Sequence, residues 1–326
     1  MKPKVFIALP IPPQAEAFIA EYCEYRKWDF KEPIPRETLL KEIVDMDGLL
    51  MVGGDIDQEL LNCAPKLKVV SNISVGYNNF DLEAMKKRSM LGTNTPSVLD
   101  ETVADLVLAL VLASARRIPE LDRYVKDGKW KKGSDGNLYG VDVHHATIGI
   151  IGMGRIGEAI AKRAKYGFDM NVFYYNRTRK IKAEENLGAQ YCTMEELLQK
   201  SDFVVLMTPL TPETTRIMGH REFSLMKDTA FFINASRGQT VDEQALLEAL
   251  VKGKIRGAGI DVYEQEPIDP EHPLLKMPNV VTLPHIGSAT EKTRLDMAML
   301  AAKNMVQALK GEQPPNIVDE LRGVRT

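Results

Sequence analysis

Residues 147–157 read Thr-Ile-Gly-Ile-Ile-Gly-Met-Gly-Arg-Ile-Gly, and this stretch decides the fold. Its first five residues form a short apolar run of the kind found in a buried strand of a parallel sheet. Residues 158–163, Glu-Ala-Ile-Ala-Lys-Arg, follow at once and favour a helix. The sequence therefore predicts a strand, a tight glycine-rich turn and a helix in direct succession.

The glycines of this turn have separate physical roles. Gly152 permits the tight turn, Gly154 lets the backbone approach a pyrophosphate, and Gly157 lets the helix pack closely on the strand. The pyrophosphate then lies at the helix N-terminus, where backbone N–H groups point toward it. Because a strand and a helix flank the pattern, we predict that it binds a dinucleotide; a purely structural turn is the alternative.

The strand expected next, at residues 171–175, runs into residues 176–180, Asn-Arg-Thr-Arg-Lys. An NAD-selective site usually has an acidic residue here, which accepts hydrogen bonds from the ribose hydroxyls. This segment has no acidic residue. Arg177, Arg179 and Lys180 instead supply cationic donors suited to a 2′-phosphate, which arginine can bind through two parallel hydrogen bonds. We expect Asn176, Arg177 and Thr178 to contact the cofactor and NADP(H) to be preferred, with NAD(H) as the second candidate and a solvated basic turn as the structural alternative.

Short runs rich in β-branched residues recur along the whole chain. They lie at residues 5–9, 49–52, 69–73, 147–151, 172–175, 203–207, 230–234, 258–262 and 280–283. Segments with helical periodicity, such as residues 195–199 and 243–252, lie between most of them. This alternation is typical of βαβ units, so the predicted fold class is α/β with parallel sheets.

The expected strands fall into two sets, one before about residue 95 and one after residue 146. A helical stretch at residues 101–117 and a polar loop at residues 126–137, rich in glycine and lysine, separate the two sets. Near the C-terminus, Ser288-Ala289-Thr290-Glu291 has the form of a capping box before a last helix that ends at about residue 310.

We expect that last helix to pack against the first set of strands. The chain is then predicted to form two doubly wound parallel-sheet domains. A discontinuous, flavodoxin-like substrate (catalytic) domain comprises residues 1–100 and 289–326, and a Rossmann NAD(P)-binding domain comprises residues 101–288.

Composition agrees with two ordinary globular domains. The chain has 326 residues, about twice the usual length of one domain. A formal net charge of −3 provides no basic field for nucleic acid. The most apolar stretch, residues 103–113, contains Asp105 and is shorter than the roughly 20 residues that span a bilayer. We expect a cytoplasmic protein without a secretory signal and without nucleic-acid or membrane partners.

The cysteines support the same compartment. Cys23, Cys63 and Cys192 are odd in number, far apart in sequence, and lack the spacing of metal ligands. We expect free thiols, no disulfide and no metal site.

Three segments each follow an expected strand of the second domain: residues 234–238, 259–267 and 283–288. In open α/β sheets, ligands bind outside the carboxyl ends of the strands, so these segments are expected to converge where a nicotinamide would lie. They carry Arg237, Glu266 and His285, three side chains that can act together.

Reduction of a 2-oxo acid needs a cation for the carboxylate, a proton donor for the developing alkoxide, and a partner for that donor. Arg237 suits the first role through its forked guanidinium, and His285 suits the second because the unperturbed pKa of histidine is near neutral. Glu266 suits the third, and Asp261 is better placed for the nicotinamide carboxamide. Taken singly, Arg237 is compatible with a surface cap, Glu266 with an acidic residue in a turn, and His285 with a hydrogen-bonded histidine at a strand end. Their joint occurrence in three strand-end segments favours catalysis.

Together these motifs resemble the D-isomer-specific 2-hydroxyacid dehydrogenase family over essentially the whole chain. Within that family the chain is similar to the bacterial glyoxylate/hydroxypyruvate reductases, which are also described as 2-ketogluconate reductases. The residues that carry the resemblance lie at 74–81, 101–105, 152–157, 234–238, 259–267 and 284–290.

The resemblance implies that Arg237, Glu266 and His285 form the catalytic set. His285 is then the acid in reduction and the base in oxidation, and both Arg237 and His285 contact the substrate. The backbone amides of Val75 and Gly76 are implied to bind the substrate carboxylate from the other domain; a plain turn after a strand is the alternative for this loop.

The resemblance also implies cofactor contacts and an oligomer. The additional cofactor-binding residues are Arg155, Ile156, Thr208, Pro209, Ala235 and Asp261. Thr208 either reaches the cofactor or caps a helix that begins near Pro212. Members of the family are typically homodimers in which the segment at residues 101–139 reaches across to the partner.

Two alternatives stay open at this point. One is a D-3-phosphoglycerate dehydrogenase, although such enzymes commonly carry additional C-terminal regulatory sequence and this chain stops shortly after residue 316. The other is a non-enzymatic NAD(P)-sensing protein of the same fold. Choice among glyoxylate, hydroxypyruvate and 2-ketogluconate depends on pocket side chains that one sequence does not reveal.

Overall fold

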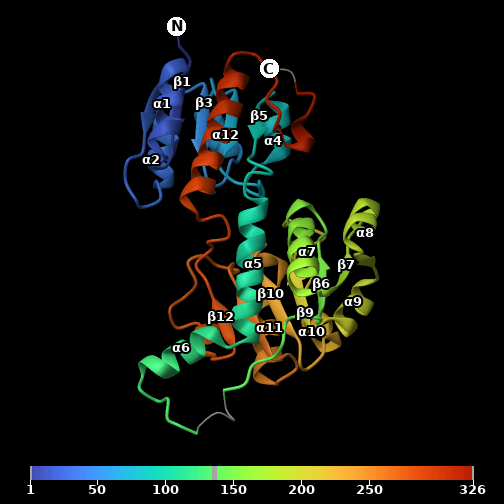
Figure 1. The fold of residues 1–326 in the computed structure, drawn as a ribbon. Coiled ribbons are helices and arrows are strands. Elements are labelled where there is room, and N and C mark those ends of the chain that lie inside the picture. The colour runs from blue at the N-terminus through green and yellow to red at the C-terminus, as the bar shows by residue number, and fades with distance from the viewer. Residues whose placement is uncertain (1, 134–137, 325–326) are drawn as a thin grey trace. The chain divides into compact units, whose positions relative to one another are not determined.

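The computed structural model describes residues 2–133 and 138–324 and divides the chain into two compact units (Figure 1). The first unit comprises Met1–Leu99 and Ala289–Thr326, and the second comprises Asp100–Ser288. Each unit is built on one parallel sheet, so the predicted α/β class is confirmed.

The first unit contains a five-stranded parallel sheet in the order β2-β1-β3-β4-β5. Its strands are β1 (Lys4–Ile7), β2 (Glu24–Lys27), β3 (Gly48–Met51), β4 (Val69–Asn72) and β5 (Leu91–Thr93). This order is that of flavodoxin-like folds. Every residue of β3 and β4 is buried, because helices cover both faces of the sheet.

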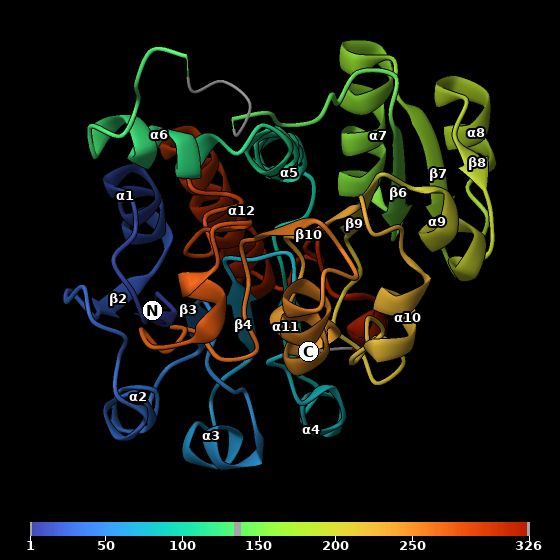
Figure 2. The same cartoon turned by 90° about the horizontal axis from the view of Figure 1, so that it is seen from below.

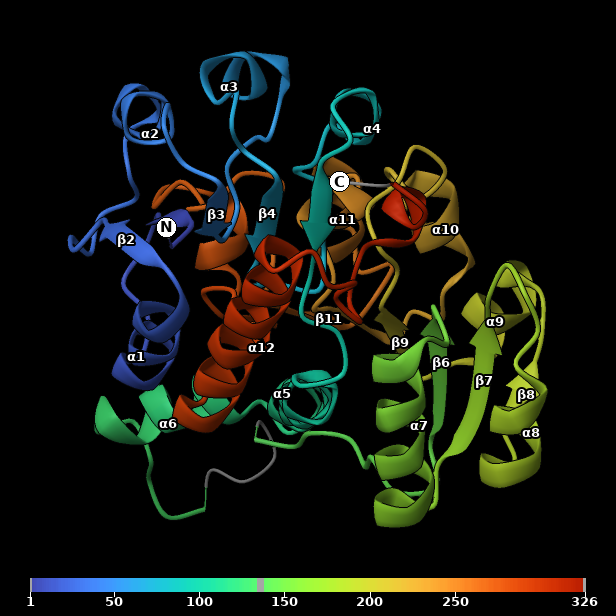
Figure 3. The same ribbon diagram turned by 90° about the horizontal axis from the view of Figure 1, so that it is seen from above.

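Helices lie on both faces of this sheet, as Figures 2 and 3 show from opposite sides. On one face are α1 (Pro13–Tyr22) and α12 (Glu291–Leu309), and on the other are α2 (Arg36–Glu42), α3 (Gln58–Cys63) and α4 (Leu82–Lys87). A short 3₁₀ helix, η4 (Asp319–Leu321), follows α12. The C-terminal segment thus completes the first unit, since α12 packs on β3 and β4.

The second unit contains a seven-stranded parallel sheet in the order β12-β11-β10-β9-β6-β7-β8. Its strands are β6 (Thr147–Ile151), β7 (Asn171–Tyr175), β8 (Gln190–Tyr191), β9 (Phe203–Leu206), β10 (Phe231–Asn234), β11 (Gly257–Ile260) and β12 (Val280–Thr282). The order reverses between β6 and β9, which makes this a Rossmann sheet with one additional strand. Ligands of such sheets bind beside that reversal, outside the carboxyl ends of the strands.

The helices of the second unit also form two layers (Figures 2 and 3). They are α5 (Asp100–Ala115), α6 (Ile118–Lys126), α7 (Arg155–Phe168), α8 (Ile181–Leu187), α9 (Met194–Lys200), α10 (His220–Leu225) and α11 (Glu243–Val251), with 3₁₀ turns η2 (Gly238–Thr240) and η3 (Pro273–Lys276). Helices α5 and α7 pack together on one face, while α9, α10 and α11 cover the other.

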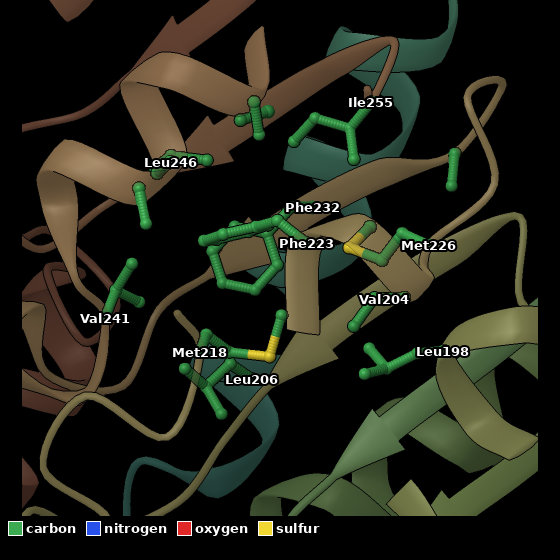
Figure 4. Close-up of a cluster of buried hydrophobic side chains, with 14 of the residues drawn as sticks. Leu198, Val204, Leu206, Met218, Phe223, Met226, Phe232, Val241, Leu246 and Ile255 are labelled. Carbon is green, nitrogen blue, oxygen red and sulfur yellow. The ribbon is translucent and has the colours of Figure 1, made fainter. Parts of the chain in front are cut away.

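The core under α9, α10 and α11 is apolar and closely packed (Figure 4). Phe223 of α10 meets Phe232 of β10 edge-to-face, with ring centroids 5.2 Å apart. Leu198 and Leu246 reach the same cluster from α9 and α11. Full burial of such a side chain contributes about 1.5–3 kcal/mol, so this cluster fixes α9, α10 and α11 against the sheet whose strand ends carry the site.

Some predicted elements differ from the structure. The sequence did not indicate β2, β5 or β8, because β2 and β8 are short and mostly exposed and β5 has only three residues. The predicted loop at residues 126–137 begins too early, since Lys126 ends helix α6, which was not predicted; residues 134–137 lie outside the described part of the chain.

The last helix also begins at a different residue from the predicted one. Its N-cap is Thr290, whose hydroxyl accepts a hydrogen bond from the N–H of Thr293 at 3.2 Å, rather than Ser288. The helix predicted near Pro212 is wrong as well: residues 212–216 form a turn, and α10 begins only at His220. Within residues 2–133 and 138–324, no helix combines the length and the apolar character needed to cross a bilayer.

Candidate active site

The glycine turn after β6 has the geometry that its sequence predicts. Gly152 has φ +104°, and a Cβ there would lie 2.6 Å from the carbonyl oxygen of Met207. A Cβ at Gly157 would lie 2.4 Å from the carbonyl oxygen of Gly152, so only glycine lets α7 approach the turn this closely. At Gly154 a Cβ would meet nothing within 4 Å. The backbone is therefore sterically crowded at Gly152 and Gly157 and open at Gly154.

The N-terminus of α7 presents unpaired backbone donors beside that opening. Gly154 is the N-cap and supplies no side-chain cap. The N–H groups of Arg155, Ile156 and Gly157 make no hydrogen bond to any other described residue. Such donors at a helix N-terminus suit an anion such as a pyrophosphate. The guanidinium of Arg155 itself binds Asp100, at 3.1 Å.

Other predicted cofactor residues lie after β9, which neighbours β6 in the sheet, and after β10, which neighbours β9. Thr208 and Pro209 follow β9, and Ala235 follows β10. The hydroxyl oxygen of Thr208 is buried and has no hydrogen-bond partner among the described residues. Because a buried hydroxyl normally finds a partner, this oxygen fits a bound polar group. The residues present here therefore fit a dinucleotide.

The basic segment after β7 separates into two parts. Arg179 forms two hydrogen bonds to the carboxylate of Glu184, both at 2.7 Å, and the Tyr174 hydroxyl donates to the same carboxylate at 2.7 Å. Arg177 is exposed and makes no hydrogen bond to a described residue. Asn176 donates to the carbonyl of Thr178 at 2.8 Å, which closes the turn. Arg177 is thus the arginine of this turn that is available to a ligand.

Arg237 lies in a rigid turn after β10. The side-chain oxygen of Asn234 accepts hydrogen bonds from the N–H and the hydroxyl of Ser236, at 3.0 and 2.8 Å. The side-chain amide of Asn234 donates to the carbonyl of Arg237 at 3.2 Å. Burial lowers the pKa of the Arg237 guanidinium, and the negative charge of Glu266 opposes that change. A partly buried arginine that feels the charge of Glu266 is well placed to bind an anion.

Gly238 brings the Arg237 turn against the next loop. A Cβ at this position would lie 1.8 Å from the carbonyl carbon of Tyr263 and 1.9 Å from its oxygen, so no other residue fits without movement of the backbone. The loop approached in this way carries Glu266.

Glu266 and His285 are in direct contact. Oε2 of Glu266 lies 2.6 Å from Nδ1 of His285, and Oε1 accepts a hydrogen bond from the N–H of Tyr263 at 3.0 Å. Burial raises the pKa of Glu266, but the hydrogen bonds from His285 and Tyr263 outweigh it, so the pKa lies below its ordinary value. An ionised carboxylate can only accept, so the proton of this contact belongs to Nδ1. Nε2 is then the ring nitrogen left for proton exchange.

Asp261 holds the loop that carries His285, a contact that the sequence did not signal. Oδ1 accepts from the N–H of Ile286 at 2.8 Å, and Oδ2 accepts from the N–H of Gly287 at 2.9 Å. Burial raises the pKa of Asp261, and the two amides oppose this change. His285 itself has φ +53°, a left-handed conformation that costs energy for a residue with a Cβ and that these two hydrogen bonds help to fix.

In the first unit, Val75 and Gly76 lie in the loop after β4. Both are partly buried, and neither backbone N–H makes a hydrogen bond to a described residue. Adjacent free N–H groups on a loop can bind a carboxylate. Among the remaining histidines, His272 pairs with Glu243 at 3.1 Å and His144 lies 3.8 Å from Asp142.

A dinucleotide turn on a Rossmann sheet, with Glu266 and His285 paired on its carboxyl-end loops, defines a nicotinamide-dependent oxidoreductase. Residues 108–287 match the family described as D-isomer specific 2-hydroxyacid dehydrogenase, NAD binding domain. The chain belongs to this family, which confirms the resemblance seen in the sequence.

Relatives match along the whole chain. A glyoxylate reductase from Thermococcus litoralis is 48% identical over 325 residues, which cover 98% of each chain. A glyoxylate/hydroxypyruvate reductase B from Yersinia pestis is 45% identical over 319 residues, again 98% of each. The crystal structure of an NADPH-dependent glyoxylate/hydroxypyruvate reductase from Sinorhizobium meliloti, in complex with NADP and malonate, is 31% identical, with a TM-score of 0.86 over 98% of each chain.

Proposed function

We propose that this protein uses NADPH to reduce glyoxylate and hydroxypyruvate to the corresponding 2-hydroxy acids, of D configuration where the product is chiral. We include 2-ketogluconate as a further substrate. Full-length relatives at 45–48% identity that carry the names of glyoxylate and glyoxylate/hydroxypyruvate reductases support the substrate class. The observation that carries the proposal is the 2.6 Å contact between Glu266 and Nδ1 of His285.

In the proposed reaction His285 is the proton donor. Nicotinamide, when bound, supplies the hydride that adds to the keto carbon of the substrate. The keto oxygen gains negative charge as that bond forms, and Nε2 of His285 gives it a proton. Glu266 orients the ring through Nδ1 and favours its protonated state by charge. In the reverse direction the neutral ring accepts the hydroxyl proton.

Arg237 and the loop after β4 bind the substrate carboxylate in this proposal. The guanidinium of Arg237 supplies a partly buried positive charge, and the N–H groups of Val75 and Gly76 supply two neutral donors. The first unit is accordingly the substrate (catalytic) domain and the second the NAD(P)-binding domain. Asp261 has a positioning role through Ile286 and Gly287 in addition to the proposed contact with the carboxamide.

The proposed preference for NADPH rests on Arg177. Its side chain is exposed and makes no hydrogen bond to a described residue, whereas Arg179 is paired with Glu184. Arg177 is therefore the residue that we assign to the 2′-phosphate, with Asn176 and Thr178 shaping the turn. The Sinorhizobium meliloti relative is an NADPH-dependent enzyme by its description, which agrees with this assignment.

We further propose that the protein acts as a homodimer through the segment at residues 101–139. Helix α6 has no buried residue, and Ile118 and Val125 on it are 52% and 53% exposed. Trp130 and Tyr139, which follow in the same segment, are 67% and 70% exposed. Large apolar side chains gathered on one exposed segment favour contact with another protein surface. Analytical ultracentrifugation that finds only monomer at micromolar concentration would refute this part.

A panel of initial rates tests the proposal. NADPH or NADH oxidation is followed by absorbance with glyoxylate, hydroxypyruvate, 2-ketogluconate and 3-phosphohydroxypyruvate. We expect turnover with the first three, and faster turnover with NADPH than with NADH. Exclusive turnover of 3-phosphohydroxypyruvate would favour the phosphoglycerate dehydrogenase alternative. Tight NADPH binding without turnover of any 2-oxo acid would favour a sensing protein.

A further inference from the structure

The loop after β4 has three consecutive backbone carbonyls that are all held by hydrogen bonds. The carbonyl of Ser74 accepts a hydrogen bond from the N–H of Thr95 at 2.8 Å. The carbonyl of Val75 accepts one from the side-chain amide of Asn94 at 2.8 Å. The carbonyl of Gly76 accepts two, from the side-chain amide of Asn72 at 3.1 Å and from the Ser74 hydroxyl at 2.5 Å. Asn72 and Asn94 are 1% and 9% exposed, so the side chains that bind these loop carbonyls are buried.

Holding a carbonyl also sets the direction of the next N–H. In a trans peptide, the C=O of one residue and the N–H of the following residue point in opposite directions. The hydrogen bonds at Ser74, Val75 and Gly76 therefore turn the N–H groups of residues 75, 76 and 77 away from the groups that hold the carbonyls. None of these three N–H groups has a partner among residues 2–133 and 138–324.

We propose that Asn94 is a positioning residue for the substrate carboxylate. By binding the Val75 carbonyl, its side chain fixes the peptide plane whose N–H, that of Gly76, is directed to the carboxylate. Asn72 and Ser74 do the same for the next peptide plane, which adds the N–H of Tyr77 as a third donor. This inference rests on the proposed function, because it names what prepares the loop for its substrate.

Both the backbone N–H and the backbone carbonyl of Asn94 are hydrogen-bonded. Its N–H donates to the carbonyl of Asn316 at 3.1 Å, and its carbonyl accepts from the side-chain amide of Asn304 at 3.1 Å. Asn304 lies on α12 and is fully buried. The segment from Ala289 onward therefore supports the loop after β4 through Asn94, although the two are separated by more than 200 positions in sequence.

A merely structural role is less consistent with this arrangement. Backbone carbonyls of a partly exposed loop can bind water without loss, so they do not need buried asparagines as partners. Orienting the loop before the substrate arrives lowers the cost of ordering it on binding. The result is a set of donors prepared for an anion.

The test compares Asn94→Ala with a matched control in the same unit. Ser71→Ala removes a buried hydroxyl that bonds Thr93 at 2.7 Å and the carbonyl of Ala301 at 2.8 Å, and it does not touch the loop. Ser74→Ala is the second variant if Asn94→Ala fails to fold. For each protein, the KM and kcat for glyoxylate, the Kd for NADPH, and the Kd for oxamate by calorimetry in the presence of NADPH are measured.

We expect Asn94→Ala to raise the KM for glyoxylate and the Kd for oxamate about tenfold, with a smaller change in kcat and an NADPH Kd within about twofold of wild type. Ser74→Ala should raise the KM for glyoxylate and the Kd for oxamate by about threefold, since Asn72 still holds the Gly76 carbonyl. Ser71→Ala should leave all of these values close to wild type.

Three outcomes would overturn the inference: oxamate affinity unchanged in folded Asn94→Ala or Ser74→Ala, an equal loss in Ser71→Ala, or no oxamate binding by the wild type. If the wild type binds oxamate in an Asn94-dependent manner but turns over no 2-oxo acid, the inference stands and the proposed function fails. The two claims are thus separable.

Discussion

Replacement of Glu266 by glutamine removes the charge beside His285 while keeping the shape of the side chain. Glutamine can still accept one hydrogen bond, from Nδ1 of His285 or from the N–H of Tyr263, but it no longer carries the negative charge that favours a protonated ring. Because the pKa of Glu266 lies below its ordinary value, the wild-type carboxylate is ionised throughout the neutral range. Loss of this charge should weaken the contact that orients the His285 ring.

The size of the effect follows from the contact. A hydrogen bond to a charged group contributes about 1.5–3 kcal/mol. The side chains of His285 and Glu266 are 45% and 36% exposed, so solvent screening places the effect at the lower end of that range. A loss of about 1.4 kcal/mol corresponds to a factor of ten in rate. The value of kcat/KM for reduction should therefore fall about tenfold in Glu266→Gln.

The assay is kcat/KM for glyoxylate reduction near pH 7, in wild type and Glu266→Gln. Asp142→Asn is the matched control, because Asp142 lies 3.8 Å from His144 in an exposed pair of the same unit. The control should keep the wild-type kcat/KM. An unchanged kcat/KM in Glu266→Gln, with the fold intact, would refute the role assigned to the pair.

Further predictions concern the cofactor, the packing of the loops and acid stability. Arg177→Ala should lower the ratio of NADPH to NADH efficiency by about tenfold, and an unchanged ratio would remove this residue from the 2′-phosphate site. Gly238→Ala should cost about 2 kcal/mol or more in urea unfolding, because its Cβ would overlap the carbonyl of Tyr263; a variant as stable as wild type would contradict the packing. A hydrogen bond from Tyr25 holds the pKa of Glu16 below its ordinary 4.5, so its stabilising effect is present above about pH 4.5 and lost as the pH falls through the folded value. Glu16→Gln should therefore be more destabilising at pH 7 than at pH 3, and an equal effect at both values would contradict the shift.

Local sequence patterns predicted the parts of the fold that depend on local chemistry. The turn after β6 needs glycine at 152 and 157 for steric reasons, and the same steric contacts appear in the structure. The strands that the sequence did not reveal lack a strong apolar pattern: β2 reads Glu-Tyr-Arg-Lys and lies at a sheet edge. At the start of α12 the sequence predicted a capping box from Ser288, whereas the backbone conformation places the N-cap at Thr290.

The candidate site was predictable where residues follow strands. Parallel strands bring their carboxyl ends to one edge, which is why Glu266 and His285 meet although 19 positions separate them. The contacts of Asp261 with two backbone amides and of Asn94 with a carbonyl depend on loop conformations that have no period or motif in the sequence. The pairing of Arg179 with Glu184 was hidden for the same reason, and it leaves Arg177 as the available arginine of this turn.

Removal of the imidazole in His285→Ala tests proton transfer most directly. The rate of NADPH oxidation with saturating glyoxylate is measured together with the Kd for NADPH, by fluorescence titration of the same preparation. We expect kcat to fall by about 10² to 10⁴ and the Kd to stay within about twofold, because the lost group acts on the keto oxygen and not on the dinucleotide. A variant that keeps a rate near that of wild type would contradict the assignment of His285 as the proton donor.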